Sequence, residues 1–187
     1  MSGKLNVKSA VNIALRLFIV CTVIASVVAS VNLITADRIA ENEKKVINDT
    51  IRSIFDYDVL NIESVGYKND DDCVKEIYRI RKDDGTLIGY SAICSPKGFG
   101  GEIRLMTAFD DGKNIIAVRV MGHSETPGIG DKIENVRTPA FTEQFVGKNE
   151  IMQYGKDGID KISGSSKSSN AVLKGINEAI LALGTVK

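Results

Sequence analysis

Residues 73–94 read CVKEIYRIRKDDGTLIGYSAIC and predict a β-hairpin. Apolar and polar residues alternate through residues 73–81 and again through residues 86–94, which is the pattern of strands that bury one face. The intervening Asp83-Asp84-Gly85 sequence is typical of a tight turn that needs a positive φ angle. We therefore expect two antiparallel strands joined at this turn.

A second hairpin is predicted downstream of the first. Alternating residues at 102–109 and 115–121 flank the turn-like sequence DDGKN at 110–114, and the Gly-rich residues 96–101 separate the two hairpins. The polar residues 57–72 are consistent with a short strand and loops. Together these segments predict a twisted antiparallel sheet.

Two helices are predicted to cover this sheet, at residues 139–146 and at residues 168–183. The second helix has one apolar stripe, and Gly184 is expected to end it. The stripe consists of Val172, Leu173, Ile176, Ala179, Ile180 and Leu183. The predicted fold class is α+β, with a small domain over residues 57–187 in which helices cover the twisted antiparallel sheet.

Residues 17–36, LFIVCTVIASVVASVNLITA, carry no formal charge and predict a transmembrane helix. In a helix they would span about 30 Å, the thickness of the hydrocarbon core, with their backbone groups bonded internally. Residues 37–56 place apolar side chains at helical spacing among Glu and Lys, which predicts a stalk helix. A cleaved signal peptide is the alternative, because Val27-Val28-Ala29 is an acceptable cleavage site, but the apolar run continues past it and favours an anchor.

Charges around the apolar run predict its orientation. Lys4, Lys8 and Arg16 precede it, so residues 1–16 are expected in the cytoplasm. For a prokaryotic chain, this orientation makes a single-pass protein of the cytoplasmic membrane and places residues 57–187 on the extracytoplasmic side.

The overall composition argues against two kinds of site. Lys and Arg number 24, Asp and Glu also number 24, aromatic residues make up 6% and Trp is absent, so a basic nucleic-acid groove with stacking side chains is not expected. The single histidine, His123, has no Cys-based ligand spacing near it, so no metal site is predicted. Glu125 can pair with His123, although a turn or packing role for the histidine is the simpler interpretation.

Cys73 and Cys94 face each other if the first hairpin is centred between Asp83 and Asp84. Outside the cytoplasm the two thiols can form a disulfide. Two reduced thiols in the envelope of an anaerobe are an equally weighted alternative, and the sequence does not separate the two.

The segment DKISGSSKSSN at residues 160–170 immediately precedes the stronger predicted helix. It places hydroxyl side chains, Gly164 and Lys167 at a helix N-terminus. Free backbone N–H groups and the positive end of the helix dipole favour an anion such as phosphate there, and Gly164 lets the backbone approach it closely. A simple N-cap is the alternative, because Ser and Asn are preferred at that position.

Two motifs carry a family resemblance. Residues 163–172, SGSSKSSNAV, resemble the SGAT-x-TS-x-AV motif of the FMN-binding domain found in the G subunit of Rnf complexes and in the C subunit of Na-pumping quinone reductases. Residues 122–133, GHSETPGIGDKI, resemble the H-x-ETPGLG-x-KI segment of the same family, in the same order. The anchor, stalk, sheet and motif order cover essentially the whole chain, and the short length is more similar to the Rnf subunit.

The resemblance implies that FMN is attached covalently. In the family, the last residue of SGAT, usually Thr, is joined through its side-chain oxygen to the phosphate of FMN, and the matching position here is Ser166. A Ser hydroxyl can form the same phosphoester with a less restricted χ1 than Thr. Ser165 replaces the family's Ala and is a rival hydroxyl one residue away. The implied cofactor-binding residues are Ser163, Gly164, Ser165, Ser166, Lys167, Ser168, Glu125 and Thr126.

The turn at residues 125–130 has two interpretations of equal weight. The resemblance implies that it lines the flavin site. A structural interpretation is that Pro127 and Gly128 make a tight turn and that Gly130 permits a second reversal of the backbone.

The resemblance also implies a function: an electron-transfer subunit of a membrane-bound Rnf-type complex, relaying electrons through covalent FMN. Such complexes couple electron flow between ferredoxin and NAD to Na⁺ or H⁺ translocation, and no independent catalytic residue is expected in this chain. The implied partners are the other membrane subunits of the complex and a flavin transferase during maturation. Two alternatives are a membrane-anchored extracytoplasmic binding or assembly module without a redox cofactor, and a stand-alone flavinylated extracellular electron carrier.

Overall fold

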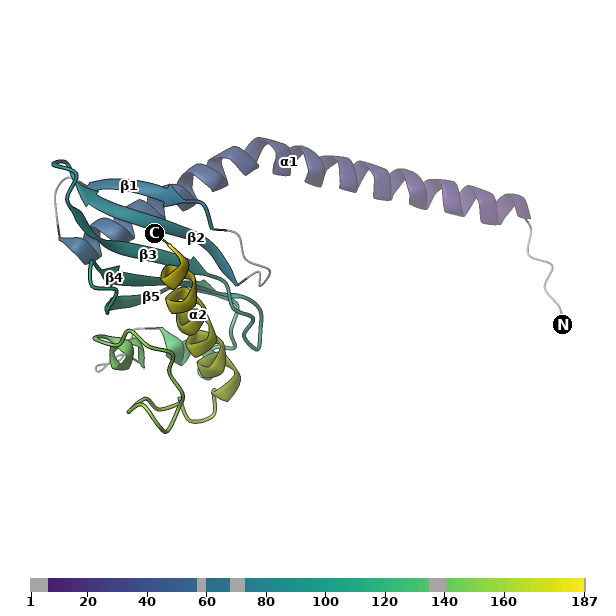
Figure 1. Cartoon of the computed structure of the whole chain (residues 1–187). Coiled ribbons are helices and arrows are strands. Elements are labelled where there is room, and N and C mark those ends of the chain that lie inside the picture. The colour runs from purple at the N-terminus through teal and green to yellow at the C-terminus, as the bar shows by residue number, and fades with distance from the viewer. Residues whose placement is uncertain (1–6, 57–59, 68–72, 135–140, 187) are drawn as a thin grey trace. The chain divides into compact units, whose positions relative to one another are not determined.

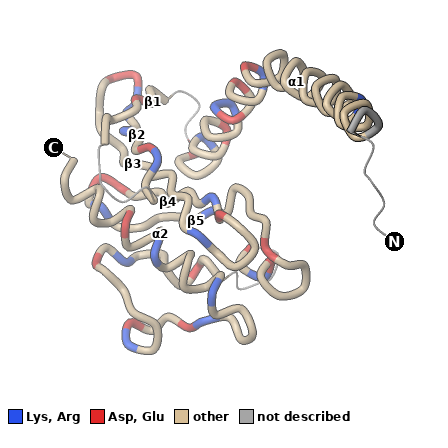
Figure 2. The backbone as a smooth tube through the Cα atoms, turned by 90° about the vertical axis from the view of Figure 1, so that its right-hand side faces the viewer, with Lys and Arg blue, Asp and Glu red and all other residues tan. Residues whose placement is uncertain are grey.

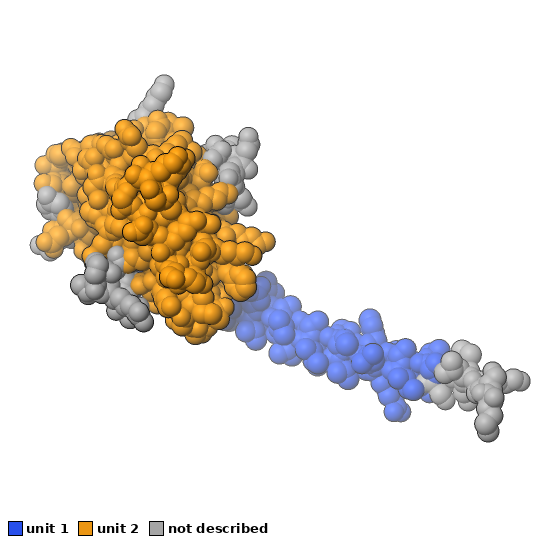
Figure 3. Space-filling model, turned by 90° about the horizontal axis from the view of Figure 1, so that it is seen from below, with its two compact units in different colours: residues 1–49 blue, residues 50–187 orange. Residues whose placement is uncertain are grey.

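The structure is a computed structural model that describes residues 7–56, 60–67, 73–134 and 141–186. The chain divides into two compact units, residues 1–49 and residues 50–187, which Figure 3 colours separately. The first unit is helical, and the second contains the sheet.

One long helix, α1 (Val7–Phe55), begins in the first unit. Its uncharged part exposes apolar side chains, and Figure 2 shows its charged residues gathered toward its C-terminal end. Hydroxyls in that uncharged part bond back along the helix: Thr22 donates to the Phe18 carbonyl at 2.8 Å and Ser26 donates to the Thr22 carbonyl at 2.7 Å. Within the described residues, α1 is the one helix long and apolar enough to cross a membrane.

The second unit is built on a five-stranded antiparallel sheet in which the strands pair in chain order (Figure 1). The strands are β1 (Leu60–Val65), β2 (Val74–Lys82), β3 (Leu87–Cys94), β4 (Ile103–Asp110) and β5 (Ile115–His123). Both predicted hairpins and the short upstream strand are therefore confirmed, with the strand ends displaced by one or two residues.

The turn between β2 and β3 contains three residues and is centred on Asp84. The Lys82 N–H donates to the Thr86 carbonyl at 2.9 Å, and the Gly85 N–H donates to the Lys82 carbonyl at 2.9 Å. Gly85 has a φ angle of +83°, as predicted for this turn. The Thr86 N–H also donates to Oδ1 of Asp84 at 2.8 Å, which stabilises the turn.

This turn changes the register that was predicted for the two cysteines. Cys94 lies opposite Val74, and the Ser95 N–H donates to the Cys73 carbonyl at 2.7 Å. The expected direct pairing of Cys73 with Cys94 is wrong because the turn is one residue longer than assumed. The two register shifts in the β2–β3 ladder offset each other, so Val74 and not Cys73 lies opposite Cys94. Both cysteines are free and buried, and their thiols are nevertheless hydrogen-bonded to each other.

Both faces of the sheet are covered. The helix α2 (Ser166–Thr185) lies across one face in Figure 1, where it packs on β3 and β4. On the other face, Phe55 at the end of α1 lies so close to Gly89 that a Cβ there would be 2.9 Å from the Phe55 ring. The core on the α2 side includes Ile77, Tyr90, Ala92, Leu105, Phe109, Val118, Val172, Ile176, Ala179 and Leu183.

Helix α2 confirms the stronger predicted helix but extends it. The predicted apolar stripe faces the core, with Ile180 half-buried and the other five residues buried. Gly184 does not end the helix as expected, because α2 continues to Thr185 and its C-cap is Val186. Lys113, in the β4–β5 turn, donates from Nζ to the Leu183 carbonyl at 3.1 Å, so a cation lies at the C-terminal end of the helix dipole.

The segment between β5 and α2 contains short 3₁₀ helices instead of the predicted helix at 139–146. These helices are η1 (Gly130–Ile133) and η2 (Phe141–Phe145). Residues 139 and 140 of the predicted helix lie outside the described residues. The sequence here is too short and too poor in helical periodicity to sustain a full α-helix.

Irregular backbone from residue 146 to residue 165 is held in place by two amide side chains. Gln144 accepts from the Asp160 N–H at 2.8 Å and donates to its carbonyl at 3.1 Å. Asn177 on α2 makes the same two-way contact with Met152, each bond 3.0 Å long. These pairs satisfy backbone groups as a neighbouring strand would, and they position the residues that lead into α2.

Candidate functional site

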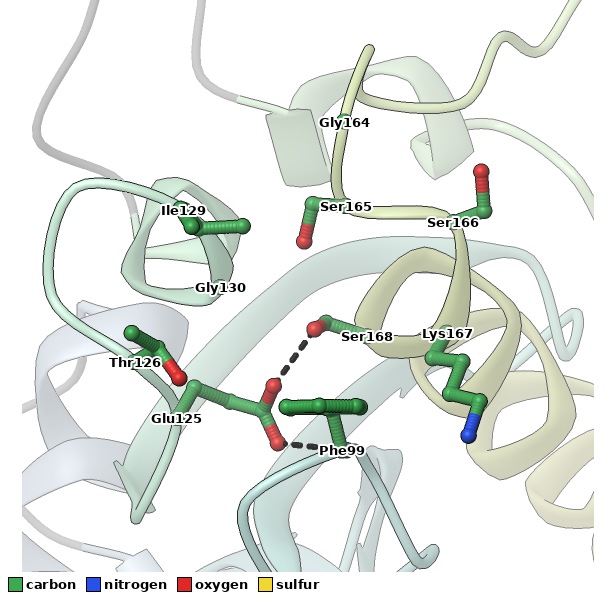
Figure 4. Close-up of a pocket in the computed structure, with 10 residues that line it drawn as sticks. All are labelled: Phe99, Glu125, Thr126, Ile129, Gly130, Gly164, Ser165, Ser166, Lys167 and Ser168. Atoms are coloured by element: carbon green, nitrogen blue, oxygen red, sulfur yellow. Dashed lines mark hydrogen bonds between the residues drawn. The ribbon is translucent and has the colours of Figure 1, made fainter.

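A pocket of about 420 Å³ lies where the N-terminus of α2 meets the turn that follows β5 (Figure 4). Three segments that are distant in sequence contribute to it. The lining residues are Phe99, Glu125, Thr126, Ile129, Gly130, Gly164, Ser165, Ser166, Lys167 and Ser168. The pocket therefore brings together both sequence motifs.

The N-terminus of α2 supplies unpaired backbone donors. The first intrahelical bond runs from the Ser169 N–H to the Ser165 carbonyl at 2.9 Å, so the N–H groups of Ser166, Lys167 and Ser168 precede the regular ladder. Ser165 is the N-cap residue, but its side chain makes no capping hydrogen bond. The simple N-cap interpretation therefore does not account for the Ser165 hydroxyl.

Adjacent residues of this turn point in different directions. In Figure 4 the hydroxyl of Ser165 points into the pocket, whereas that of Ser166 points away from it. Ser165 is 4% exposed, and its hydroxyl oxygen has no hydrogen-bond partner. Ser166 is exposed and is the first residue of α2.

The carboxylate of Glu125 joins the three segments of the pocket. Its Oε1 accepts from the N–H groups of Phe99 at 2.8 Å and Gly100 at 3.1 Å. Its Oε2 accepts from the Ser168 hydroxyl at 2.5 Å. Glu125 is 6% exposed, so this buried carboxylate has the donors that an anion in such a place requires.

Glycines leave the space that the Glu125 side chain occupies. A Cβ on Gly98 would lie 2.2 Å from Oε1 of Glu125, and a Cβ on Gly130 would lie 2.6 Å from its Cβ and from Oε2. Gly130 therefore serves close packing. It has no left-handed φ angle and begins the 3₁₀ helix η1, so its lack of a Cβ is needed for the contact with Glu125 and not for its backbone conformation.

The turn that begins at Thr126 is confirmed. The Ile129 N–H donates to the Thr126 carbonyl at 3.2 Å, with Pro127 and Gly128 at the central positions. Gly128 has a φ angle of +77°, as a type II turn requires. The same turn lines the pocket, so the structural and the ligand-lining interpretations are compatible.

Two exposed apolar side chains flank the polar groups of the pocket. Phe99 is 66% exposed and Ile129 is 51% exposed, and both belong to the lining. Nζ of Lys167 lies 5.2 Å from the centroid of the Phe99 ring, which is within cation–π range. The rim of the pocket thus offers an aromatic face, an aliphatic side chain and a positive charge.

His123 contacts both ends of the segment from Glu125 to Glu134. Its Nδ1 accepts from the Glu125 N–H at 3.2 Å, and its Nε2 lies 2.9 Å from Oε1 of Glu134. The carboxylate partner of His123 is therefore Glu134, and the predicted side-chain pair with Glu125 does not form. The structural role given to His123 as the simpler interpretation agrees with these contacts.

Seven of the eight residues predicted from sequence line this pocket. The exception is Ser163, which is exposed and lies outside the lining. Gly164 lines it with a φ angle of +79°. Phe99 was not predicted, and the signal that could have identified it is an aromatic residue within the glycine run 98–101.

Two family models match the chain. The model of the FMN-binding domain matches residues 98–181, which include every lining residue of the pocket, and the model of the RnfG N-terminal region matches residues 1–54. The two matched regions lie on either side of the first hairpin.

Curated relatives match over most of their lengths. The G subunit of the proton-translocating ferredoxin:NAD(+) oxidoreductase complex of Clostridium ljungdahlii is 30% identical over 88% of this chain and 86% of the relative. The G subunit of the ion-translocating oxidoreductase complex of Haemophilus influenzae (strain PittEE) is 28% identical over 88% and 84%. The G subunit of the Na(+)-translocating ferredoxin:NAD(+) oxidoreductase complex of Acetobacterium woodii is 28% identical over 90% and 88%.

A solved structure is also similar to part of the chain. The crystal structure of Shewanella oneidensis NqrC matches 63% of this chain and 63% of its own, with 22% identity and a TM-score of 0.48.

Proposed function

We propose that this chain, which belongs to the family of the G subunits of ion-translocating oxidoreductase complexes, relays electrons through covalently bound FMN. It contains the FMN-binding domain of that family. In this proposal residues 17–36 cross the cytoplasmic membrane once and residues 37–56 form the stalk. Residues 1–16 are cytoplasmic, because the positive charges precede the apolar run. Residues 57–187 are then extracytoplasmic.

The observation that carries the proposal is the position of Ser166 at the pocket. Its hydroxyl is exposed, so a maturation enzyme can reach it, and its residue begins α2. The hydroxyl points away from the pocket in Figure 4, but the exposed Ser166 side chain has room to rotate about χ1. After that rotation, a phosphate esterified to Ser166 Oγ would lie near the unpaired N–H groups of the helix and the positive end of its dipole. Lys167 adds a positive charge beside it.

The other pocket residues are suited to the rest of a flavin nucleotide. Phe99 and Ile129 offer apolar surface to a planar ring, and the buried carboxylate of Glu125 fixes the loop that carries Phe99. FMN, when bound, supplies reversible electron transfer, while the chain supplies attachment, orientation and partial exclusion of water. A covalent ester also prevents loss of the cofactor outside the cell.

Further partners follow from this assignment. The transmembrane helix and stalk would contact the other membrane subunits of an Rnf-type complex. During maturation a flavin transferase would transfer FMN from a flavin dinucleotide to Ser166 Oγ, with the other nucleotide as the leaving group that takes the hydroxyl proton. The complex, and not this chain alone, would couple electron flow between ferredoxin and NAD to Na⁺ or H⁺ translocation.

Denaturing electrophoresis under ultraviolet light, combined with intact mass spectrometry, tests the assignment. Full-length protein from cells that contain a flavin transferase should fluoresce and should be heavier by FMN less one water. Ser166→Ala should abolish both signals and Ser166→Thr should retain them. Ser64→Ala, an exposed serine on β1 outside the pocket, should also retain them as the matched control. A colourless wild-type band with the mass of the bare polypeptide would favour the binding or assembly module without a redox cofactor.

Co-purification separates the complex-bound protein from the stand-alone carrier. Mild detergent extraction should recover the flavinylated chain together with other membrane subunits. Recovery of a flavinylated chain alone, at every detergent tested, would support a stand-alone extracellular carrier.

A further inference from the structure

The hydroxyl of Ser165 is a buried polar group that the folded chain itself does not satisfy. Of the buried side-chain polar atoms without a hydrogen-bond partner in the described part of the chain, only that of Ser165 lines the pocket. Burial without a partner costs free energy, so such groups usually have a ligand or water to bind.

Local structure offers this hydroxyl a partner that it does not take. Ser165 is the N-cap residue of α2, where a Ser side chain ordinarily accepts from an N–H of the first turn. Its side chain makes no such bond and points into the pocket instead (Figure 4). The neighbouring Ser168 and Ser169 hydroxyls, by contrast, are bonded to Glu125 Oε2 and to the Ser165 carbonyl.

The surroundings of Ser165 also leave it free to donate. The Glu125 carboxylate is occupied by Phe99, Gly100 and Ser168, and does not accept from Ser165. Ile129, across the pocket, is apolar. A ligand that enters the pocket is therefore the acceptor that the Ser165 hydroxyl faces.

We infer that Ser165 is a positioning residue that donates a hydrogen bond to the part of the flavin inside the pocket, while Ser166 carries the ester. This inference rests on the proposed function. Ala occupies this position in the motif that the segment resembles, so the additional donor is a feature of this chain and not of the motif. Its expected effect is to hold the flavin in the pocket, not to attach it.

A thermal cycle on the full chain in detergent tests the inference. Wild type and Ser165→Ala are each purified after expression with and without flavin transferase, and Tm is measured for all four. Without flavin, Ser165→Ala should not lower Tm, because no hydrogen bond is lost. With flavin, the gain in Tm should be smaller in Ser165→Ala than in wild type, and the flavin absorption band should shift. Ser64→Ala, an exposed serine on β1 outside the pocket, is the matched control and should match wild type throughout.

Titration with free FMN gives an answer that does not depend on covalent attachment. The Ser166→Ala chain is titrated with FMN, and the Ser165→Ala/Ser166→Ala chain should bind about fivefold more weakly, the expected loss for one neutral hydrogen bond. Equal affinities, or equal gains in Tm with unchanged spectra, would overturn the inference even if the flavin is attached to Ser166.

The remaining outcomes separate the two proposals. Loss of covalent flavin in Ser165→Ala, with retention in Ser166→Ala, would show that Ser165 is the esterified residue and would overturn its role as a donor. Wild-type protein that stays unmodified in the presence of the transferase would overturn the proposed function, and the FMN titration would still decide the role of Ser165.

Discussion

The hydroxyl of Ser168 donates a 2.5 Å hydrogen bond to Oε2 of Glu125, a residue 43 positions earlier in the chain. This bond joins the first turn of α2 to the turn that follows β5. Since the other carboxylate oxygen of Glu125 holds the loop at Phe99, one side chain fixes the relative positions of the three segments that line the pocket. Changes at Glu125 should therefore alter the pocket as well as stability.

Replacement of Glu125 should destabilise the domain in proportion to the acceptors that are removed. Glu125→Ala leaves the N–H groups of Phe99 and Gly100 without their acceptor and should cost about 3 kcal/mol in the free energy of unfolding. Glu125→Gln keeps one oxygen for these donors and should cost about 1 kcal/mol. Denaturant unfolding of the flavin-free protein measures both values.

Glu150 provides the control, because it is exposed and Glu150→Ala should change stability by less than about 0.5 kcal/mol. Both Glu125 variants should also incorporate less flavin, with the Ala variant more affected. Wild-type stability in Glu125→Ala would mean that the carboxylate does not hold these segments together.

Gly130→Ala and Gly128→Ala should separate a packing role from a conformational one. A Cβ on Gly130 would lie 2.6 Å from Glu125 and 3.1 Å from the Ser168 hydroxyl, so it must displace the central hydrogen bond of the pocket. A Cβ on Gly128 meets no atom within 4 Å, but its φ angle of +77° is strained for Ala by about 1 kcal/mol.

Flavin incorporation, measured as the ratio of flavin absorbance to protein, should therefore fall in Gly130→Ala and stay near the wild-type value in Gly128→Ala. Both variants should lose stability. Equal flavin content in the two variants would argue that the close contact of Gly130 with Glu125 is unimportant for the site.

Much of the fold could be predicted because its signals are local. The alternation in residues 73–94 and the turn at Gly85 identify a hairpin without any knowledge of the rest of the chain. The cysteine register could not be predicted, because the turn contains three residues and not two, a difference that the sequence Asp83-Asp84-Gly85 does not specify. The helix predicted at 139–146 is a short 3₁₀ helix in its described part, because the segment is too short and has too little helical periodicity to sustain a full α-helix.

The candidate site was predictable to the extent that it follows sequence motifs. The segments at 163–168 and 125–130 line the same pocket because α2 begins beside the turn after β5. Phe99 escaped prediction because its contribution depends on backbone contacts with Glu125 across 26 positions. The different directions of the Ser165 and Ser166 hydroxyls also depend on how the chain enters α2, which residue types do not specify.

The thiols of Cys73 and Cys94 should resist alkylation in the native protein. Cys94 is fully buried, and its hydrogen bond with Cys73 together with burial raises its pKa well above the ordinary value, so little thiolate is present at pH 8. Iodoacetamide without reductant should label neither residue in the folded chain and both after denaturation, as measured by peptide mass mapping. Absence of label after denaturation, reversed by a reductant, would show that the pair forms a disulfide.

Tyr154 should stabilise the start of α2 through its hydroxyl, which donates to the Ser169 carbonyl at 2.6 Å. Tyr154→Phe should therefore lower the free energy of unfolding by about 1 kcal/mol at pH 7. Burial raises the pKa of Tyr154, so the native state keeps its proton at pH values where the unfolded chain loses it. The contribution of the Tyr154 hydroxyl to the free energy of unfolding is therefore fully present below about pH 10, and it decreases as the pH rises above that value. Denaturant unfolding at pH 7, 10 and 11 should show that the difference in free energy of unfolding between wild type and Tyr154→Phe shrinks as the pH rises. Tyr90→Phe, in the same core, is the control and should lose less stability at pH 7. A difference that grows above pH 10 would contradict a stabilising hydrogen bond from the protonated Tyr154 hydroxyl.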